Sequence, residues 1–167
     1  DFIAVINQDA RASPGWLEQS VKALEATPTA AFVTPKLLIK QDPERINTCG
    51  NAIHISGITT CRGYNQPADS NTKPTFVMGM SGAALVGRLG DFRRLGGFDE
   101  SFFMYHEDTD LSLRSALAGI NCLYEPSAVV LHSFEPSFSA DKLYLLERNR
   151  YITLLKVFRI PTLFLLG

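Results

Sequence analysis

One stretch of this chain, residues 96–111, decides how the rest is interpreted, and it reads Gly96-Gly97-Phe98-Asp99-Glu100-Ser101-Phe102-Phe103-Met104-Tyr105-His106-Glu107-Asp108-Thr109-Asp110-Leu111. The stretch carries five carboxylates and four aromatic rings. Charges at this density do not suit a core, because a buried charge must be paired. They suit the polar mouth of a catalytic site. Apolar residues then recur on one helical face up to Gly119, which predicts a helix over residues 108–118. The acidic cluster is therefore expected where a loop enters a helix.

Strands and helices alternate along the rest of the chain. Strands are predicted at residues 2–6, 31–35, 37–40, 75–78, 121–124 and 128–131, and helices at 16–27, 91–95 and 141–158. Residues 81–86 fit either a strand or a buried turn, and the polar span 41–73 contains a hairpin around residues 52–60. The apolar run at residues 2–6 is typical of a buried strand in a parallel sheet. Alternation of this kind is typical of an α/β layered domain.

Composition limits the classes of function. The chain has 167 residues, of which 46% are apolar and 20% charged, and its net charge is −1. These values fit one globular domain with a substantial core. A nearly neutral charge without Lys/Arg blocks argues against a nucleic-acid partner. The three cysteines, Cys49, Cys61 and Cys122, lack metal-type spacing, so we expect reduced thiols with a packing role.

Several motifs, in order, resemble those of family 2 glycosyltransferases, particularly the bacterial rhamnosyltransferase-like branch. They are Asn7-Gln8-Asp9, Pro14-Gly15-Trp16-Leu17, Glu107-Asp108, His132 and Arg148-Asn149-Arg150. The resemblance spans residues 1 to about 156. It implies an α/β fold of the GT-A type, with a mixed, mostly parallel sheet flanked by helices. Residues 1–158 would form the carboxyl-terminal portion of that domain, and residues 159–167 an apolar tail that associates with a membrane or is truncated.

The resemblance implies a divalent cation held by Asp9 and His132. A nucleotide diphosphate leaves more easily when a cation neutralises its oxygens, and hard oxygen ligands suit Mg²⁺ or Mn²⁺. An imidazole ligand favours Mn²⁺. His132 follows a predicted strand, where ligands gather in open α/β sheets. The alternatives are that Asp9 only shapes a turn and that His132 is an ordinary hydrogen-bonded surface residue.

The same resemblance makes Asp108 the catalytic base of an inverting transfer. Such a base takes the proton of the acceptor hydroxyl as that oxygen attacks the anomeric carbon. A helix amino terminus favours an ionised carboxylate. The alternative for Glu107 and Asp108 is helix capping. On the acceptor side we expect Glu107, Gly97, whose backbone can approach a ligand closely, and Tyr105, whose ring either stacks on a sugar or packs.

Donor binding is assigned to Asn7, Arg148 and Arg150. Guanidinium groups suit diphosphate oxygens because their planar fork binds two oxygens at once, and Asn7 would orient its loop or contact a ribose. A solvated helix face is the alternative for the two arginines. Asp110 and Arg114 have the spacing of an ordinary exposed ion pair. The small-residue segment 79–84 is expected between donor and acceptor.

The sequence thus predicts a metal-dependent inverting glycosyltransferase. It would move a sugar, with rhamnose suggested by the branch, from a UDP-, GDP- or dTDP-sugar to a glycan or lipid-linked acceptor. Because the chain opens on a strand, we expect the preceding nucleotide-binding units to be missing and the isolated chain to bind donor weakly. A non-catalytic glycan- or partner-binding module is the alternative. The expected location is cytoplasmic, with peripheral contact at the inner membrane face and self-association both left open.

Overall fold

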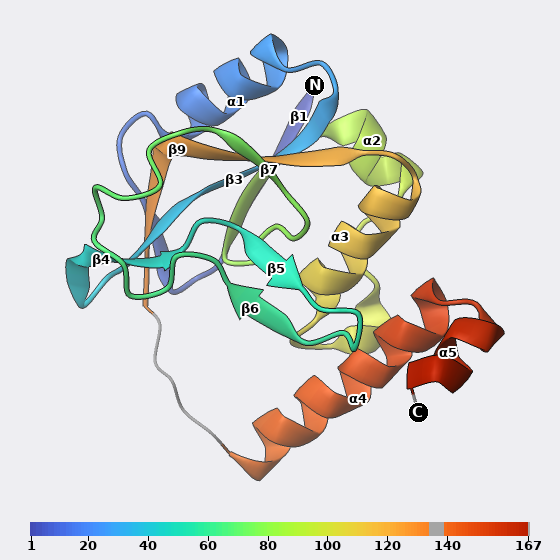
Figure 1. Ribbon diagram of the computed structural model, residues 1–167. Helices are drawn as coiled ribbons and strands as arrows, with labels where there is room; N and C mark the ends of the chain where they lie inside the picture. Colours follow the sequence, from blue (N-terminus) through green and yellow to red (C-terminus); the bar gives the residue numbers. More distant parts are fainter. Residues whose placement is uncertain (134–138, 167) are drawn as a thin grey trace.

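A computed structural model of the chain describes residues 1–133 and 139–166 (Figure 1). Its strands are β1 (Phe2–Ile6), β2 (Ala10–Ala12), β3 (Ala30–Ile39), β4 (Asp42–Thr48), β5 (Asn51–Ile53), β6 (Thr59–Cys61), β7 (Thr75–Val77), β8 (Ala84–Arg88) and β9 (Asn121–His132). Its helices are α1 (Trp16–Ala26), α2 (Leu89–Arg94), the 3-10 turn η1 (Glu100–Phe102), α3 (Glu107–Leu117), α4 (Ala140–Val157) and α5 (Ile160–Leu166). The predicted helices and the predicted hairpin are confirmed, with small differences at their ends.

A mixed seven-stranded sheet forms the centre of the fold. Its order is β1-β8-β3-β9-β2, with β4 paired to β3 and β7 paired to β9. The longest ladder joins β3 and β9 in parallel, and the other pairings of this sheet are antiparallel. The α/β class and the mixed sheet are confirmed. Most of the strand pairings are antiparallel, whereas we expected a mostly parallel sheet. The strands β1, β2, β4 and β7 are short, and each runs antiparallel to its neighbour because no crossover connection makes it parallel.

Two pairs of predicted strands are in fact two long strands. β3 continues through Pro35, and β9 continues through Pro126. The register between them jumps at this point, from Pro35 opposite Glu125 to Lys36 opposite Val129. Proline lacks the N–H that a ladder needs, and a bulge tolerates that loss. The prolines therefore bend the two strands together rather than ending them.

Helices cover both faces of the sheet, as Figure 1 shows. On one face α1 buries Trp16 and Leu24 against sheet residues that include Val33 and Val86. Neighbouring strand positions point the other way, where Phe32 packs with Leu111 of α3 and with flanking side chains of α2. Side chains alternate across a strand, so each of β3 and β8 contributes to both cores. Full burial of such side chains stabilises the fold by about 1.5–3 kcal/mol each.

The carboxyl-terminal helices lie beside the amino end of α3. Helix α4 contacts α3, and α5 occupies most of the expected apolar tail, whose last residue, Gly167, lies outside the described residues. None of the helices in the described part combines the length and the hydropathy needed to cross a membrane. The three cysteines are free, and Cys49 and Cys122 are buried, as expected for packing residues. Cys61 is exposed at the end of the short strand β6, so the packing role expected of it is wrong.

Candidate active site

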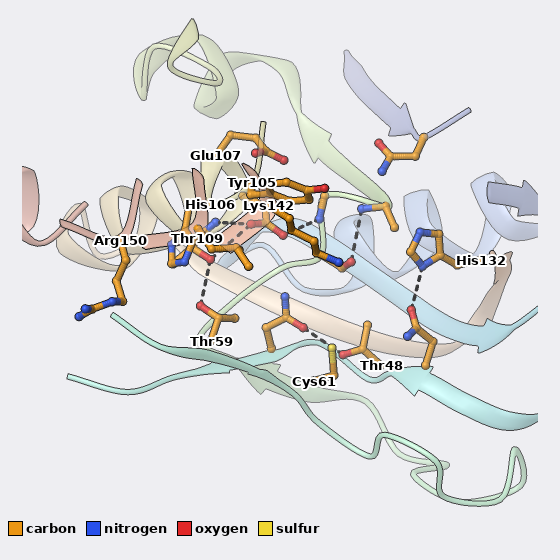
Figure 2. Close-up of a pocket in the computed structure, with 18 of the residues that line it drawn as sticks. Thr48, Thr59, Cys61, Tyr105, His106, Glu107, Thr109, His132, Lys142 and Arg150 are labelled. Carbon is orange, nitrogen blue, oxygen red and sulfur yellow. Dashed lines mark hydrogen bonds between the residues drawn. The ribbon is translucent and has the colours of Figure 1, made fainter. Parts of the chain in front are cut away.

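A cavity of about 800 Å³ opens between the sheet, the amino end of α3 and the face of α4 (Figure 2). It is lined by Asn7, Asp9, Asn47, Thr48, Asn51, Ile58, Thr59, Cys61, Ser81, Gly82, Ala83, Tyr105, His106, Glu107, Asp108, Thr109, His132, Ser133, Lys142, Leu146, Glu147 and Arg150. Segments that lie far apart in the sequence thus line the same cavity. Its volume lies in the range typical of small-molecule sites.

Strand β2 brings Asp9 to His132. The sequence predicted only a loop here, but Ala10 pairs with His132 at the end of β9, and the Ser133 N–H donates to the Asp9 carbonyl at 3.1 Å. This register leaves Asp9 Oδ2 3.6 Å from His132 Nε2. A single cation about 2.1 Å from each atom could bridge them, because such bonds allow separations up to about 4.2 Å.

Asn47 sets the orientation of the His132 ring. Its Oδ1 accepts a hydrogen bond from His132 Nδ1 at 2.9 Å, so in the neutral ring Nε2 carries the lone pair that faces Asp9. A second polar partner of this kind is typical of metal-bound histidines. Burial lowers the pKa of His132, while the Asp9 carboxylate opposes that effect. A neutral imidazole and a carboxylate therefore face the same space, an arrangement that fits a cation.

Asp9 and His132 are the side chains that face each other across the space that such an ion would fill. Among residues 1–133 and 139–166, no group of three or more His, Cys, Asp or Glu side chains is placed to hold a metal. Asn7 lies beside the pair in the cavity wall, where its amide carbonyl is a further oxygen ligand type. Its backbone is fixed by hydrogen bonds to Ala83 and Ala10 that close the turn before β2.

Asp108 stands at the first turn of α3 and faces Gly82. Its Oδ2 accepts the Gly82 N–H at 2.8 Å, and its Oδ1 accepts the Thr109 N–H at 2.7 Å. Oδ1 also accepts a hydrogen bond from the Thr109 hydroxyl at 3.3 Å, whereas Oδ2 has a single donor and can accept a further hydrogen bond from a ligand in the cavity. The predicted base is thus held by two backbone donors and points to the same hollow as Asp9 and His132.

Glu107 and His106, which precede Asp108, are half-buried in the cavity wall. Burial raises the pKa of Glu107, and the Asp108 charge adds to that effect. Burial lowers the pKa of His106, with Asp108 opposing. Within the described part of the chain, neither Glu107 Oε2 nor His106 Nδ1 has a hydrogen-bond partner. These two atoms are therefore candidates to bind ligand hydroxyls.

Helix α4 forms the far wall. Arg150 pairs with Glu147 at 2.6 Å and donates to the Ser56 carbonyl of the β5–β6 hairpin at 2.9 Å. Lys142 lies over the Tyr105 ring, 5.7 Å from its centroid. Figure 2 shows Arg150 and His132 at opposite ends of the labelled residues. The cavity is therefore long, with the Asp9–His132 pair at one end and Arg150 at the other.

Most of the predicted site residues meet in this cavity, and two do not. Asn7, Asp9, Tyr105, Glu107, Asp108, His132 and Arg150 all line it. Gly97 lies behind α3, where its carbonyl accepts a hydrogen bond from Arg114. Arg148 points to the Ser101 carbonyl at 3.0 Å. Neither belongs to the lining residues.

The sequence analysis missed the wall formed by Asn47, Thr48, Asn51 and Thr59. These residues fall in the polar span 41–73, which gave no periodic signal because β4, β5 and β6 are short and mostly exposed. Thr59 ties this wall to α3 through a contact between its Oγ1 and Thr109 Oγ1 at 3.1 Å. The span itself does not single out these four residues, because Asn and Thr are common in ordinary loops and turns.

Comparisons with known proteins find similarity along most of the chain. The family described as glycosyl transferase family group 2 matches residues 2–152. The chain is 32% identical to the N-acetylglucosaminyl-diphospho-decaprenol L-rhamnosyltransferase of Mycobacterium tuberculosis, over 84% of the chain and 50% of that protein. It is 41% identical to the rhamnosyltransferase WbbL of Escherichia coli over 40% of the chain and 25% of that protein. The chain thus spans about half the length of the first relative and a quarter of the second.

One solved structure supports the fold. The crystal structure of GalNAc-T7 with UDP, GalNAc and Mn²⁺ matches 96% of the chain and 32% of that protein, with a TM-score of 0.68 and 16% sequence identity. At this identity the likeness concerns the fold alone.

Proposed function

The chain belongs to glycosyl transferase family group 2, in its rhamnosyltransferase-like branch with the GT-A fold, and from that premise we propose that it carries the metal site and the base of an inverting sugar transfer. The observation that carries the proposal is the meeting of Asp9, His132 and Asp108 in one cavity. These residues come from the turn before β2, the end of β9 and the start of α3. A tertiary arrangement, rather than any single motif, unites them.

The donor diphosphate would lie at the Asp9–His132 end. A divalent cation bound there, Mn²⁺ or Mg²⁺, would neutralise the charge that develops on the departing diphosphate. His132 and Asp9 would hold that ion, with Asn47 fixing the imidazole. The donor class is a nucleotide diphospho-sugar, UDP-, GDP- or dTDP-linked. Rhamnose is supported by the names of the two rhamnosyltransferase relatives.

Asp108 would accept the proton in the chemical step. The acceptor hydroxyl oxygen forms a bond to the anomeric carbon while the bond from that carbon to the diphosphate oxygen breaks on the opposite face. The hydroxyl proton passes to Asp108, and the anomeric centre is inverted. Two backbone N–H groups fix the carboxylate, so it need not reorganise during the reaction.

The acceptor would enter from the α4 side. Arg150 was expected with the donor diphosphate, but its place at the end opposite His132 favours the acceptor (Figure 2). Glu107, Tyr105 and His106 lie between and present hydroxyl-binding and stacking groups to a sugar. The acceptor class is a glycan or a lipid-linked saccharide, which the decaprenol-linked acceptor in the name of one relative supports.

Peripheral contact with the inner face of a membrane fits a lipid-linked acceptor. Leu143, Tyr144, Tyr151 and Leu155 of α4 and Ile160 of α5 are exposed, as an interfacial surface requires. The proposal also includes a cytoplasmic location and self-association of the chain.

The experiment that tests the proposed function combines turnover and metal binding. The protein is supplied with Mn²⁺ and a panel of UDP-, GDP- and dTDP-sugars, and release of the nucleoside diphosphate is followed with a saccharide acceptor. We expect Asp108→Asn to lower kcat by a factor on the order of 100 to 10,000 without weakening Mn²⁺ binding measured by calorimetry. Asp9→Asn should weaken Mn²⁺ binding, and Asp42→Asn, at an exposed position on β4, should change neither.

Two results would contradict the proposal. Full turnover by Asp108→Asn would show that Asp108 is not the catalytic base. Binding of saccharide without any turnover across the donor panel would favour the non-catalytic binding module instead.

A further inference from the structure

The loop that leads into α3 holds an unusual backbone conformation. Phe103, Tyr105 and His106 have positive φ angles of 62°, 68° and 68°. At Phe103 a ψ of −58° and a hydrogen bond from the Met104 N–H to the Phe102 carbonyl at 2.7 Å make a γ-turn with positive φ, a rare and strained turn. None of these residues is a glycine, which would adopt positive φ freely. We name residues 102–106 the strained segment.

Asn149 of α4 binds the strained segment at three points. Its Nδ2 lies 3.0 Å from the carbonyl oxygen of Phe102 and 2.7 Å from those of Met104 and Tyr105, so its two N–H groups are shared among three acceptors. The side chain is completely buried. Residues held in sparsely populated conformations persist only where their surroundings fix them, and one amide here contacts three of the five carbonyls in the segment.

Arg148 extends this contact by one residue. Its Nη1 donates to Asn149 Oδ1 at 2.8 Å, and its Nη2 donates to the Ser101 carbonyl at 3.0 Å. Both polar atoms of the Asn149 side chain are therefore used within the protein. The Arg148-Asn149 pair faces the loop and not the cavity, which gives this part of the sequence motif a role other than binding phosphate.

The strained segment continues directly into the candidate catalytic residues. Tyr105 and His106 are followed by Glu107 and Asp108, and all four line the cavity. The His106 carbonyl accepts the Asp110 N–H at 2.8 Å, which joins the segment to the first turn of α3. The direction in which α3 starts, and with it the approach of Asp108 to Gly82, therefore depends on the conformation at Tyr105 and His106.

We infer that Asn149 is a positioning residue: it holds the strained segment in its left-handed conformations and thereby orients Asp108 toward the acceptor hydroxyl. The inference rests on the proposed function for its catalytic consequence. Its structural part, the coupling of Asn149 to residues 102–106, can be measured without any substrate.

The central test compares Asn149→Leu, which keeps the side-chain size and removes the donors, with Thr153→Val. Thr153 lies one turn further along α4, is completely buried, and its hydroxyl has no partner among the described residues. It is therefore a matched control for loss of a buried polar group. For Asn149→Leu we expect kcat to fall on the order of 100-fold, since a displacement of about 1 Å can have that effect, with the donor KM and Mn²⁺ binding unchanged. Thr153→Val should keep the wild-type kcat.

A rescue separates positioning from general packing. Phe103 is 82% exposed, so Phe103→Gly relieves the γ-turn without opening the core. In the Asn149→Leu background we expect Phe103→Gly to recover at least part of the lost kcat. If Asn149 only packs α4 against the fold, Phe103→Gly will recover nothing, and the inference is overturned.

Amide hydrogen exchange gives the readout that does not need turnover. Asn149→Leu should speed exchange in residues 102–108 and leave β9 and α1 as in the wild type, whereas Thr153→Val should leave residues 102–108 protected. Unchanged protection there in Asn149→Leu would overturn the inference even if the enzyme is active. Failure of the wild type to transfer any sugar would count against the proposed function alone, since the exchange comparison still decides the coupling.

Discussion

Gly82 is the residue against which the two carboxylates of the cavity rest. A Cβ built on it would lie 3.2 Å from Glu107 Oε1 and 3.4 Å from Asp108 Oδ2. Its φ lies outside the left-handed region, so a substitution acts through space and not through backbone strain. A substitution at Gly82 therefore tests how the positions of the Glu107 and Asp108 carboxylates affect activity.

We predict that Gly82→Ala lowers kcat about 10-fold to 100-fold, because a displacement of a few tenths of an ångström at the base misaligns the proton transfer. Thermal stability should change little. The control is Gly90→Ala, where a Cβ meets nothing within 4 Å and helix α2 should gain about 0.5–1 kcal/mol. Equal kcat for the two variants would show that Gly82 does not shape the site.

Glu107 gives a pH-dependent prediction. Burial raises its pKa above the ordinary value of 4.5. Below pH 4.5 the carboxyl is protonated in both the folded and the unfolded state, so its stabilising effect is fully present. As pH rises toward the folded-state pKa, the unfolded chain loses this proton more readily, and stability falls. Glu107→Gln removes this loss.

The measurement is thermal unfolding of Glu107→Gln and the wild type from about pH 4 to about pH 8. We expect the variant to be the more stable protein at neutral pH and the difference to shrink toward pH 4. A constant difference across this range would refute the assignment of a raised pKa to Glu107.

For individual residues, the sequence could predict a role only where the neighbouring residues indicate it. Asp9 follows a strand, His132 ends one, and Asp108 opens a helix, so each stands where ligands gather. Asn47 showed no such sign, and Asn149 stood only as the middle residue of the Arg148-Asn149-Arg150 motif, with no role of its own. Their importance arises from partners 85 and 44 to 47 residues away in the sequence, and an isolated asparagine gives no sign of such partners.

Helix α3 is anchored by a buried charge cluster that the sequence described only in part. The predicted pair of Asp110 with Arg114 is present, at 2.5 Å, but it is not an exposed surface pair. The Asp110 side chain is fully buried and also contacts Lys156 of α4 at 2.6 Å. Lys156 in turn binds Asp99, whose pKa it holds well below the usual range. Two helices and the loop after α2 thus share one set of charges.

We predict that Asp110→Asn destabilises the protein by about 3 kcal/mol, measured by chemical denaturation. Loss of one partner of a buried pair typically costs about 3–5 kcal/mol, and the low end applies because Arg114 and Lys156 remain 22% and 31% exposed. Glu18→Gln, which breaks the exposed Glu18–Lys22 pair of α1, should leave the denaturation midpoint nearly unchanged, because exposed ion pairs contribute little to stability. Similar losses in both variants would contradict the buried character of the cluster.

Among the elements, the amphipathic helices, the β5–β6 hairpin and the short strand β7 were predicted, whereas β2 and β4 were not. Helices α1 and α3 carry apolar residues at helical spacing, which is visible in any window of the sequence. Strand β2 has three residues, and its pairing with β9 depends on the fold rather than on its own composition. The breaks predicted at Lys36 and at residues 125–127 were wrong because the register shift after Pro35 falls opposite the segment that contains Pro126, a fact of pairing that neither segment shows alone.

At the scale of the whole molecule, the described residues enclose a long cavity with chemically different ends. The Asp9–His132 end carries the two candidate metal ligands, and the Arg150 end is built from α4 and the β5–β6 hairpin. Separate ends suit a reaction in which an acceptor attacks the anomeric carbon of a donor from the face opposite the departing diphosphate. A substitution at either end should therefore affect one substrate more than the other.

We predict that Arg150→Ala raises the KM for the acceptor about 10-fold, as expected for loss of one charge-assisted contact of about 1.5 kcal/mol, and leaves the donor KM within about twofold of the wild type. Steady-state kinetics with each substrate varied in turn provides the measurement. Lys22→Ala, on the exposed side of α1, serves as a charge-matched control. A selective rise in the donor KM would instead support the original expectation that Arg150 binds the donor diphosphate.

The two candidate metal ligands differ in their access to water, since the side chain of Asp9 is 47% exposed and that of His132 only 15%. An ion held between them would have an open hemisphere and would exchange readily with the medium. Activity should then depend on the concentration of free manganese in solution. A chelator should inhibit the enzyme quickly, and added manganese should restore activity without refolding.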